Sequence, residues 1–278
     1  MSNESGHWYT RDGKAAHTQK TKPGAKNPTR PTTIRDAKEQ DLLPSVSGIT
    51  RVMSAPGLDY YKNQQLVKAC FDCPATGDEN FDDYFKHVSE KSGQDAGGAA
   101  ELGTVIHAAL ESYYAEPLIY TPHDILVGDQ AVSSEDFIRP VDKAIKELGL
   151  EVMHAEKVLV NDAYGYAGTT DIIFRTADSY GVADFKTTRT KPGKPKEPNE
   201  SHPLQIAAYI AAFWGEDYDY PIGPKAKGYN IFISTTEIGR VEIKEWSYEE
   251  LITSWDVFNH CLALWRWRNG YDPRCLKK

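Results

Sequence analysis

Hydrophobic and polar positions along the chain change their period several times between residues 100 and 270. Apolar residues recur every three or four positions over residues 103–116, where Ile106, Leu110 and Tyr113 share one face, and Pro117 ends the run. This spacing predicts a helix. Similar spacing predicts helices over residues 134–148, 204–214 and 248–268, and the last one starts with a capping-box pair, Ser247 and Glu250.

Between and after these helices, apolar and polar residues alternate as they do in strands. Strands are predicted over residues 154–162, 169–175, 182–187, 226–234 and 240–246. The central order is therefore helix, three strands, helix, strand. A sheet with helices packed on its faces buries such a pattern, so the sequence predicts an α/β fold.

The first hundred residues are less regular. Residues 1–43 are polar and rich in Lys, Thr, Pro and Gly, and they predict a basic N-terminal arm, whereas residues 44–278 predict a single domain. Residues 74–101 are acidic and contain several glycines, which favours a loop or a frayed helix. Residues 11–38 hold eight basic and two acidic residues, a local charge of +6 within a chain of net charge −8. The acidic remainder argues against a protein that simply coats nucleic acid, but the arm can hold a polyanion locally.

Composition narrows the class of protein. Hydrophobic residues make up 40% and charged residues 26% of the chain, as in ordinary globular proteins. No apolar run is long enough to cross a bilayer, and the N-terminus lacks a signal-peptide core, so we expect a cytoplasmic protein without a membrane partner. Four cysteines are too few for a disulfide scaffold and favour free thiols in a reducing compartment.

Two carboxylates stand out because each lies in an otherwise apolar strand. Asp171 is in the segment GTTDIIF and Asp184 is in VADFKT. The tight turn between the two strands predicts antiparallel neighbours, so the carboxylates can converge on one point. Two buried carboxylates close together are unfavourable unless a divalent cation neutralises them. Magnesium suits such a site, because it prefers oxygen ligands and leaves positions open for water and phosphate.

Lys186 follows Asp184 by two residues, so strand periodicity places both side chains on the same face. An ammonium group beside two carboxylates and a metal can orient the attacking water and offset charge in the transition state of phosphodiester hydrolysis. The alternative is an ordinary ion pair on an exposed strand. A D-x-K triplet alone does not decide between the two.

Other candidates lie on the predicted helices. His107 and Glu111 are four residues apart on one helical face, and the imidazole of His107 is a candidate metal ligand. Gln205 and Tyr209 repeat this spacing on a later helix and are candidates for hydrogen bonds to a phosphate or a terminal nucleotide. The alternatives are a polar histidine at a helix edge and a plain amphipathic helix.

These residues form four motifs in a fixed order. They are G-x-x-x-H from Gly103 to His107, G-x-x-D from Gly168 to Asp171, D-F-K-T from Asp184 to Thr187, and Q-x-x-x-Y from Gln205 to Tyr209. The set resembles the RecB-like branch of the PD-(D/E)XK nucleases. Residues 35–46 and 57–62 also resemble bacteriophage-encoded exonucleases, so the resemblance covers about residues 35 to 235.

The resemblance implies a restriction-endonuclease-like core, a mixed sheet flanked by helices in the order αβββαβ, with additional N- and C-terminal helices. It implies that Asp171, Asp184 and Lys186 are catalytic, with one or two Mg²⁺ or Mn²⁺ ions held by both aspartates, His107 and the backbone carbonyl of Phe185. The implied substrate contacts are Gln205, Tyr209, Arg189 and Lys191, and the further candidate carboxylates are Glu111 and Glu156. An iron–sulfur cluster, known in related nucleases, is not favoured, because Cys261 and Cys275 lack ligand-like spacing.

The implied activity is hydrolysis of DNA from an end, in phage recombination or DNA processing, with a single-strand-annealing or recombination protein as a candidate partner. A structure-specific or restriction-type endonuclease on the same fold is an alternative. Outside the enzymes, the alternatives are a catalytically silent DNA-binding module and a zinc-stabilised interaction protein built on Cys70 and Cys73. Strand polarity and oligomeric state are not indicated by the sequence.

Overall fold

A mixed five-stranded sheet forms the centre of the computed structural model, which describes residues 7–53, 56–77, 79–116, 118–215 and 221–276. The strand order is β11-β10-β9-β8-β7. Strands β9 and β10 are parallel, and the other neighbours are antiparallel. The bounds are β7 (Glu151–Asn161), β8 (Tyr166–Arg175), β9 (Tyr180–Thr188), β10 (Ala226–Ser234) and β11 (Val241–Trp246). The predicted α/β class is confirmed.

The connections explain the strand directions. A tight turn joins β8 to β9, in which the amide of Thr176 donates to the carbonyl of Ser179 at 2.8 Å, so these strands are antiparallel as predicted. Parallel strands need a crossover connection. Helix α6 (Ser201–Trp214) supplies it between β9 and β10.

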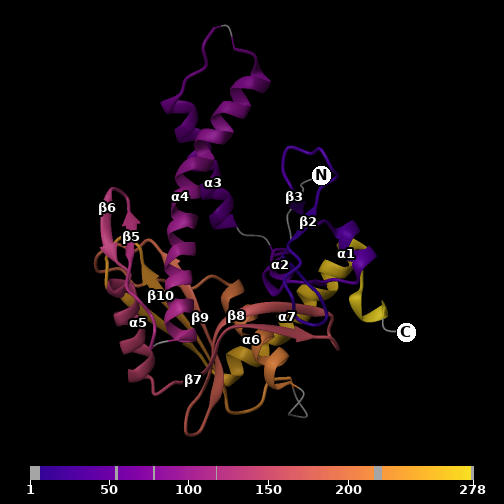
Figure 1. Ribbon diagram of the computed structural model, residues 1–278, viewed down its shortest axis with the longest axis vertical. Coiled ribbons are helices and arrows are strands. Elements are labelled where there is room, and N and C mark those ends of the chain that lie inside the picture. Colours follow the sequence, from indigo (N-terminus) through magenta and orange to yellow (C-terminus); the bar gives the residue numbers. More distant parts are fainter. Residues whose placement is uncertain (1–6, 54–55, 78, 117, 216–220, 277–278) are drawn as a thin grey trace.

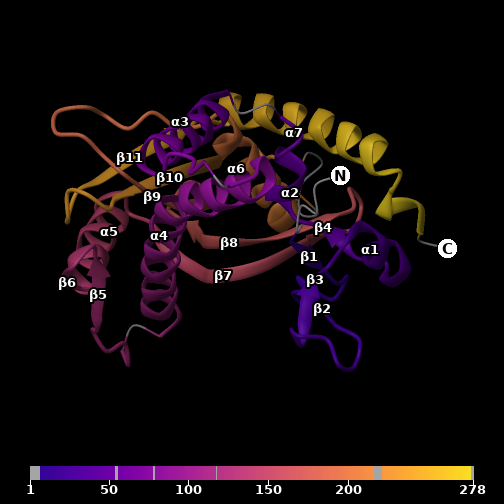
Figure 2. The same ribbon diagram turned by 90° about the horizontal axis from the view of Figure 1, so that it is seen from above.

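Alternate residues of the sheet point into two separate cores. Ile173 and Val182 pack with α6, α7 (Tyr248–Asn269) and α2 (Val46–Thr50). Ile172 and Ala183 pack on the opposite face with α4 (Phe81–Ala115) and α5 (Glu135–Glu147). Figure 2 shows α7 on one side of the sheet and α5 on the other. Because the strands are buried on both faces, a charged residue within them needs a specific partner.

Of the two alternatives for residues 74–101, a loop or a frayed helix, the structure shows a helix over most of the segment, because α4 begins at Phe81 and runs for 35 residues. The side chain of Asn80 caps the helix by accepting from the amide of Asp83 at 3.0 Å. Asp82 and Asp83 lie in the first turn, where negative charge stabilises a helix. Helix α3 (Pro56–Asp72) packs against α4, and the two form a hairpin that projects from the sheet (Figure 1).

The segment predicted as a basic N-terminal arm contacts strand β8 through residues 8–9 and 43–44, whereas residues 18–31 are largely exposed. The short pairs are β1 (Trp8–Tyr9) with β4 (Leu43–Pro44) and β2 (Thr18–Lys20) with β3 (Thr29–Pro31), and α1 spans Ile34–Gln40. Trp8 is buried against Trp265, and the Arg11 guanidinium pairs with Asp41 and Asp162. A few large side chains therefore anchor a segment that has no hydrophobic periodicity.

Two smaller elements complete the described chain. A hairpin of β5 (Asp124–Val127) and β6 (Gln130–Ser133) precedes α5, and a short 3-10 helix (Pro273–Leu276) follows α7. Neither element was predicted from the sequence. Among the helices in the described part of the chain, none combines the length and the apolar character that crossing a bilayer requires.

Candidate active site

A row of polar residues crosses the sheet from β7 to β10. The pairings of Ala155 with Ile172 and of Lys157 with Thr170 place Glu156 level with Asp171. The pairing of Ile172 with Ala183, continued by one residue, brings Asp171 level with Asp184, which in turn pairs with Asn230. We call Glu156, Asp171, Asp184 and Asn230 the polar row.

Asp184 is the most deeply buried carboxylate of the polar row, with 6% of its surface exposed. Its Oδ2 lies 2.7 Å from the Lys186 ammonium and accepts a hydrogen bond from Asn230 Nδ2 at 2.9 Å. Asn230 Oδ1 accepts from the indole N–H of Trp246 at 2.8 Å. Burial raises the pKa of Asp184. The positive charge of Lys186 offsets this rise only in part, so a further positive charge would stabilise the ionised carboxylate.

Asp171 is held from two sides. Its Oδ2 accepts from the backbone amide of Phe185 at 2.6 Å, and its Oδ1 lies 3.8 Å from His107 Nδ1. Burial on its own would raise the pKa of Asp171, but His107 and Lys186 outweigh it, and the pKa is lowered. The pKa of His107 is raised by Asp171 in spite of burial. Helix α4, which carries His107, packs on the opposite face of the sheet from α6.

Lys186 is a fixed positive charge in this site. Its Nζ lies 3.3 Å from Gln205 Oε1 on α6 as well as 2.7 Å from Asp184. Burial would lower the pKa of Lys186, but the two aspartates outweigh it, and the pKa is raised. An ammonium group in this position can orient a water and neutralise developing negative charge.

Glu156 has an unusual backbone for a residue within a strand. Its φ is 46°, in the left-handed region, and the register of β7 shifts between Val152 and His154. Burial, Asp171 and Glu111 together raise the pKa of Glu156 to about 8. The raised pKa favours the protonated form of Glu156 beside Asp171.

Two glycines of the motifs allow neighbouring elements to pack closely against each other. A Cβ at Gly103 on α4 would lie 2.7 Å from Thr187 Oγ1 on β9. A Cβ at Gly168 on β8 would lie 2.8 Å from Tyr209 Cε1 on α6. Contacts this short do not occur without a shift, so each glycine permits a close approach that brings two motifs together. Tyr209 itself is 7% exposed, and its role in substrate binding stays a prediction.

Arg189 and Lys191 lie beyond the end of β9 in the exposed segment that leads to α6. They are three and five residues after Lys186, on the same chain segment. Their place is compatible with contacts to a bound strand, which stay a prediction.

Sequence reasoning missed Asn230 and Trp246, which support Asp184 from β10 and β11. A signal for Asn230 was present, because it is an uncharged polar residue in the middle of an apolar strand, AKGYNIFIS. Such a residue needs a buried hydrogen-bond partner. Asp184 and Trp246 are those partners.

Of the three carboxylates in the polar row, Asp171 and Asp184 are the pair on strands β8 and β9. Among the described residues, no three His, Cys, Asp or Glu side chains are grouped closely enough to hold an ion by themselves. Mg²⁺ typically binds through one or two carboxylates and takes its remaining ligands from water and substrate phosphates. Asp171 and Asp184 supply two hard oxygen donors on adjacent strands, so their chemistry fits such an ion.

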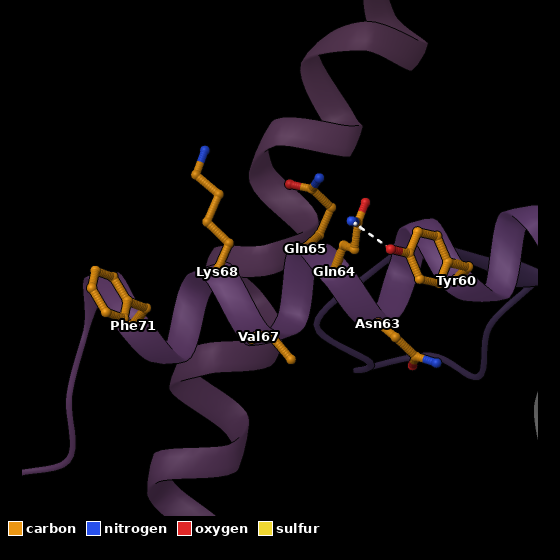
Figure 3. Close-up of a pocket in the computed structure, with 7 residues that line it drawn as sticks. All are labelled: Tyr60, Asn63, Gln64, Gln65, Val67, Lys68 and Phe71. Atoms are coloured by element: carbon orange, nitrogen blue, oxygen red, sulfur yellow. Dashed lines mark hydrogen bonds between the residues drawn. The ribbon is translucent and has the colours of Figure 1, made fainter.

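A separate hollow lies along α3, lined by side chains of that helix between Tyr60 and Phe71 (Figure 3). The described residues that line it include no carboxylate, imidazole or thiol. Cys70 and Cys73 are free thiols at the end of α3, and Cys261 is buried in α7. The side chain of Cys275 lies outside the described residues.

His202 is a buried histidine beside this site whose titration is expected to affect stability. Burial and the positive charges of Lys186 and Lys196 lower the pKa of His202 to about 3. In the unfolded chain His202 is therefore protonated below about pH 6.5, whereas in the folded protein it stays neutral until about pH 3. The free energy of unfolding should be highest above pH 6.5 and fall by up to about 1.4 kcal/mol per pH unit between pH 6.5 and 3.

Chemical denaturation of His202→Gln across this pH range tests the expectation. In His202→Gln, the free energy of unfolding should fall less steeply with decreasing pH than in the parent. In His260→Gln, at an exposed position of α7, it should fall as steeply as in the parent. Identical slopes in the parent and in His202→Gln would contradict the assignment.

Comparisons with known proteins add little to this geometry. No family model matches the chain, and no curated protein matches it. Fifteen chains of solved structures match. One, described as "Crystal structure of SSO0001", has 16% sequence identity and a TM-score of 0.28, with 75% of this chain and 86% of that chain covered. A similarity this weak carries no argument about function.

Proposed function

We propose that this chain is a metal-dependent DNA nuclease with the PD-(D/E)XK fold, of the RecB-like branch, that hydrolyses phosphodiester bonds from a DNA end. One observation carries the proposal. Asp171 and Asp184 stand level on adjacent strands, and the Lys186 ammonium lies 2.7 Å from Asp184. The mixed sheet with helices on both faces, and the order of its elements, are compatible with this fold.

Each residue of the site has a role in this proposal. Asp171, Asp184, the Phe185 carbonyl and His107 would hold one or two Mg²⁺ or Mn²⁺ ions. A bound ion would polarise the scissile phosphate and make a water more acidic. The Lys186 ammonium would orient the attacking water and offset charge on the phosphate oxygens. Gln205 holds the Lys186 ammonium in place through its Oε1.

Release of acid-soluble nucleotide from linear duplex DNA tests this activity. With Mg²⁺ or Mn²⁺ the protein should release nucleotides steadily, and with EDTA release should stop, because the two carboxylates cannot bind the phosphate without an intervening cation. Covalently closed circular DNA is the matched control and should stay intact. Equal release in EDTA would contradict a metal-dependent nuclease, and cutting of closed circles would assign an endonuclease instead.

A further inference from the structure

The segment between β9 and α6 forms a long loop at one end of the sheet (Figure 2), and part of it is a defined turn. The amide of Lys194 donates to the carbonyl of Lys191 at 3.1 Å across Pro192 and Gly193. Gly193 has a φ of 71°, as the third position of a type II turn requires, and proline is favoured at the second. The two lysines at the ends of this turn are both exposed.

Arg240, just before β11, fastens this turn to the sheet. Its Nη1 donates to the carbonyl of Lys191 at 3.0 Å, and its Nη2 donates to the carbonyl of Lys194. The same two nitrogens pair with the carboxylates of Glu237 and Glu242. Because this half-buried guanidinium is engaged with two carbonyls and two carboxylates, Arg240 is not free to bind a ligand itself.

Further contacts fix the chain on both sides of the turn. The Thr190 hydroxyl donates to Glu237 Oε2, and the amide of Thr190 donates to Thr236 Oγ1 at 3.0 Å. On the other side, the amide of Lys196 donates to Glu242 Oε2 at 2.8 Å. The backbone of the loop is therefore held in place while its long basic side chains remain on the surface.

The part of the loop that contains this turn carries only positive charge. Residues 189–196 carry four basic side chains and no acidic one, although the whole chain has a net charge of −8. Two carboxylates that contact the segment, Glu237 and Glu242, are paired with Arg240, and Glu197 is the first acidic residue after it. A pre-organised set of lysine ammonium groups that continues directly from the strand of Asp184 and Lys186 is complementary to a polyanion.

We infer that the turn fastened by Arg240 is a phosphate-contacting element for the DNA strand, in which Lys191 and Lys194 bind backbone phosphates and Arg240 is a positioning residue. The inference rests on the proposed function, since it assumes that a strand crosses the polar row. Lys191 is five residues beyond Lys186, at most about 17 Å along extended chain. At a rise of about 3.4 Å per nucleotide, the contacts fall up to about five nucleotides from the scissile bond.

Fluorescence anisotropy with a fluorescein-labelled thymidine dodecamer in EDTA tests the inference without cleavage. Lys191→Ala/Lys194→Ala should weaken binding about 25-fold at 0.1 M salt, because each lost phosphate contact removes about 0.7 from the slope of log affinity against log salt. Arg240→Gln should cause most of this loss. Added to the double lysine variant it should change affinity less than about twofold, because it acts through the same contacts.

Two control measurements distinguish the loss of the phosphate contacts from a general loss of positive charge. Lys143→Ala/Lys146→Ala, which removes the same charge from exposed positions of α5, should bind the dodecamer like the parent. The Lys143→Ala/Lys146→Ala protein should also cleave a thymidine dinucleotide, which is too short to reach the turn, with the parent's kcat and KM.

An unchanged affinity and salt slope in the double lysine variant would overturn the inference while leaving the nuclease proposal intact. A full additional loss in the triple variant would show that Arg240 binds the strand directly. A parent protein that neither binds the dodecamer nor releases nucleotide would instead overturn the proposed function.

Discussion

Replacing Asp184 by Asn should reduce the rate of nucleotide release by about a thousandfold. Loss of a single group that stabilises the transition state typically costs about 10²- to 10³-fold in kcat. Here the substitution removes a hard anionic oxygen from the polar row and also the nearest counterion of Lys186, 2.7 Å away. Both effects act on the same step, so we expect the upper end of that range.

The shape of the site should survive this substitution. Asparagine matches the volume of aspartate and keeps an oxygen that can accept from Asn230 Nδ2, so the circular dichroism spectrum should be that of the parent. The matched control is Asp178→Asn, in the exposed turn between β8 and β9, which should digest linear DNA at the parent rate. An Asp184→Asn protein that digests DNA as fast as the parent would refute the site assignment.

Replacing Gly181 by Ala should lower the free energy of unfolding by about 3 kcal/mol, at the upper end of what overpacking costs. A Cβ at this position would lie 1.7 Å from the carbonyl oxygen of Lys227, its partner on β10, and 3.0 Å from Phe174 Cζ. Backbone cannot move aside as a flexible side chain can. The β9–β10 pairing must therefore open, three residues from the Asp184–Asn230 hydrogen bond.

Urea denaturation of the variant measures this loss. Gly93→Ala on α4 is the control, since a Cβ at that position would meet nothing within 4 Å, and it should stabilise the protein by about 0.5 to 1 kcal/mol. Because Gly181 lies outside the polar row, nuclease activity should fall with the folded fraction. Equal midpoints for the parent and Gly181→Ala would contradict the close approach of the two strands.

The central strands could be predicted from the sequence because their signals are local. Alternation, turn residues and apolar content located β8 and β9 within a few residues, and with them the neighbouring positions of Asp171 and Asp184. The spacing of Asp184 and Lys186 likewise placed both on one face, where their side chains meet. Period and turn chemistry act over a few residues, so a single sequence carries them.

Other features depend on contacts between distant segments, which the sequence does not display. Trp8 lies in a polar stretch without periodicity, yet it is buried against Trp265. The N-terminal half of α4 is acidic and rich in glycine, and a cap at Asn80 together with packing against α3 makes it helical. Arg240 resembles any surface arginine until its contacts to the Lys191–Lys194 turn are seen.

Anomalous scattering from crystals soaked in Mn²⁺ tests most directly whether Asp171 and Asp184 share a divalent cation. We expect a strong peak between the two carboxylates, about 2.1 Å from an oxygen of each, and its absence from Asp184→Asn crystals treated in the same way. Parent crystals at saturating Mn²⁺ without density between these carboxylates would contradict a shared cation.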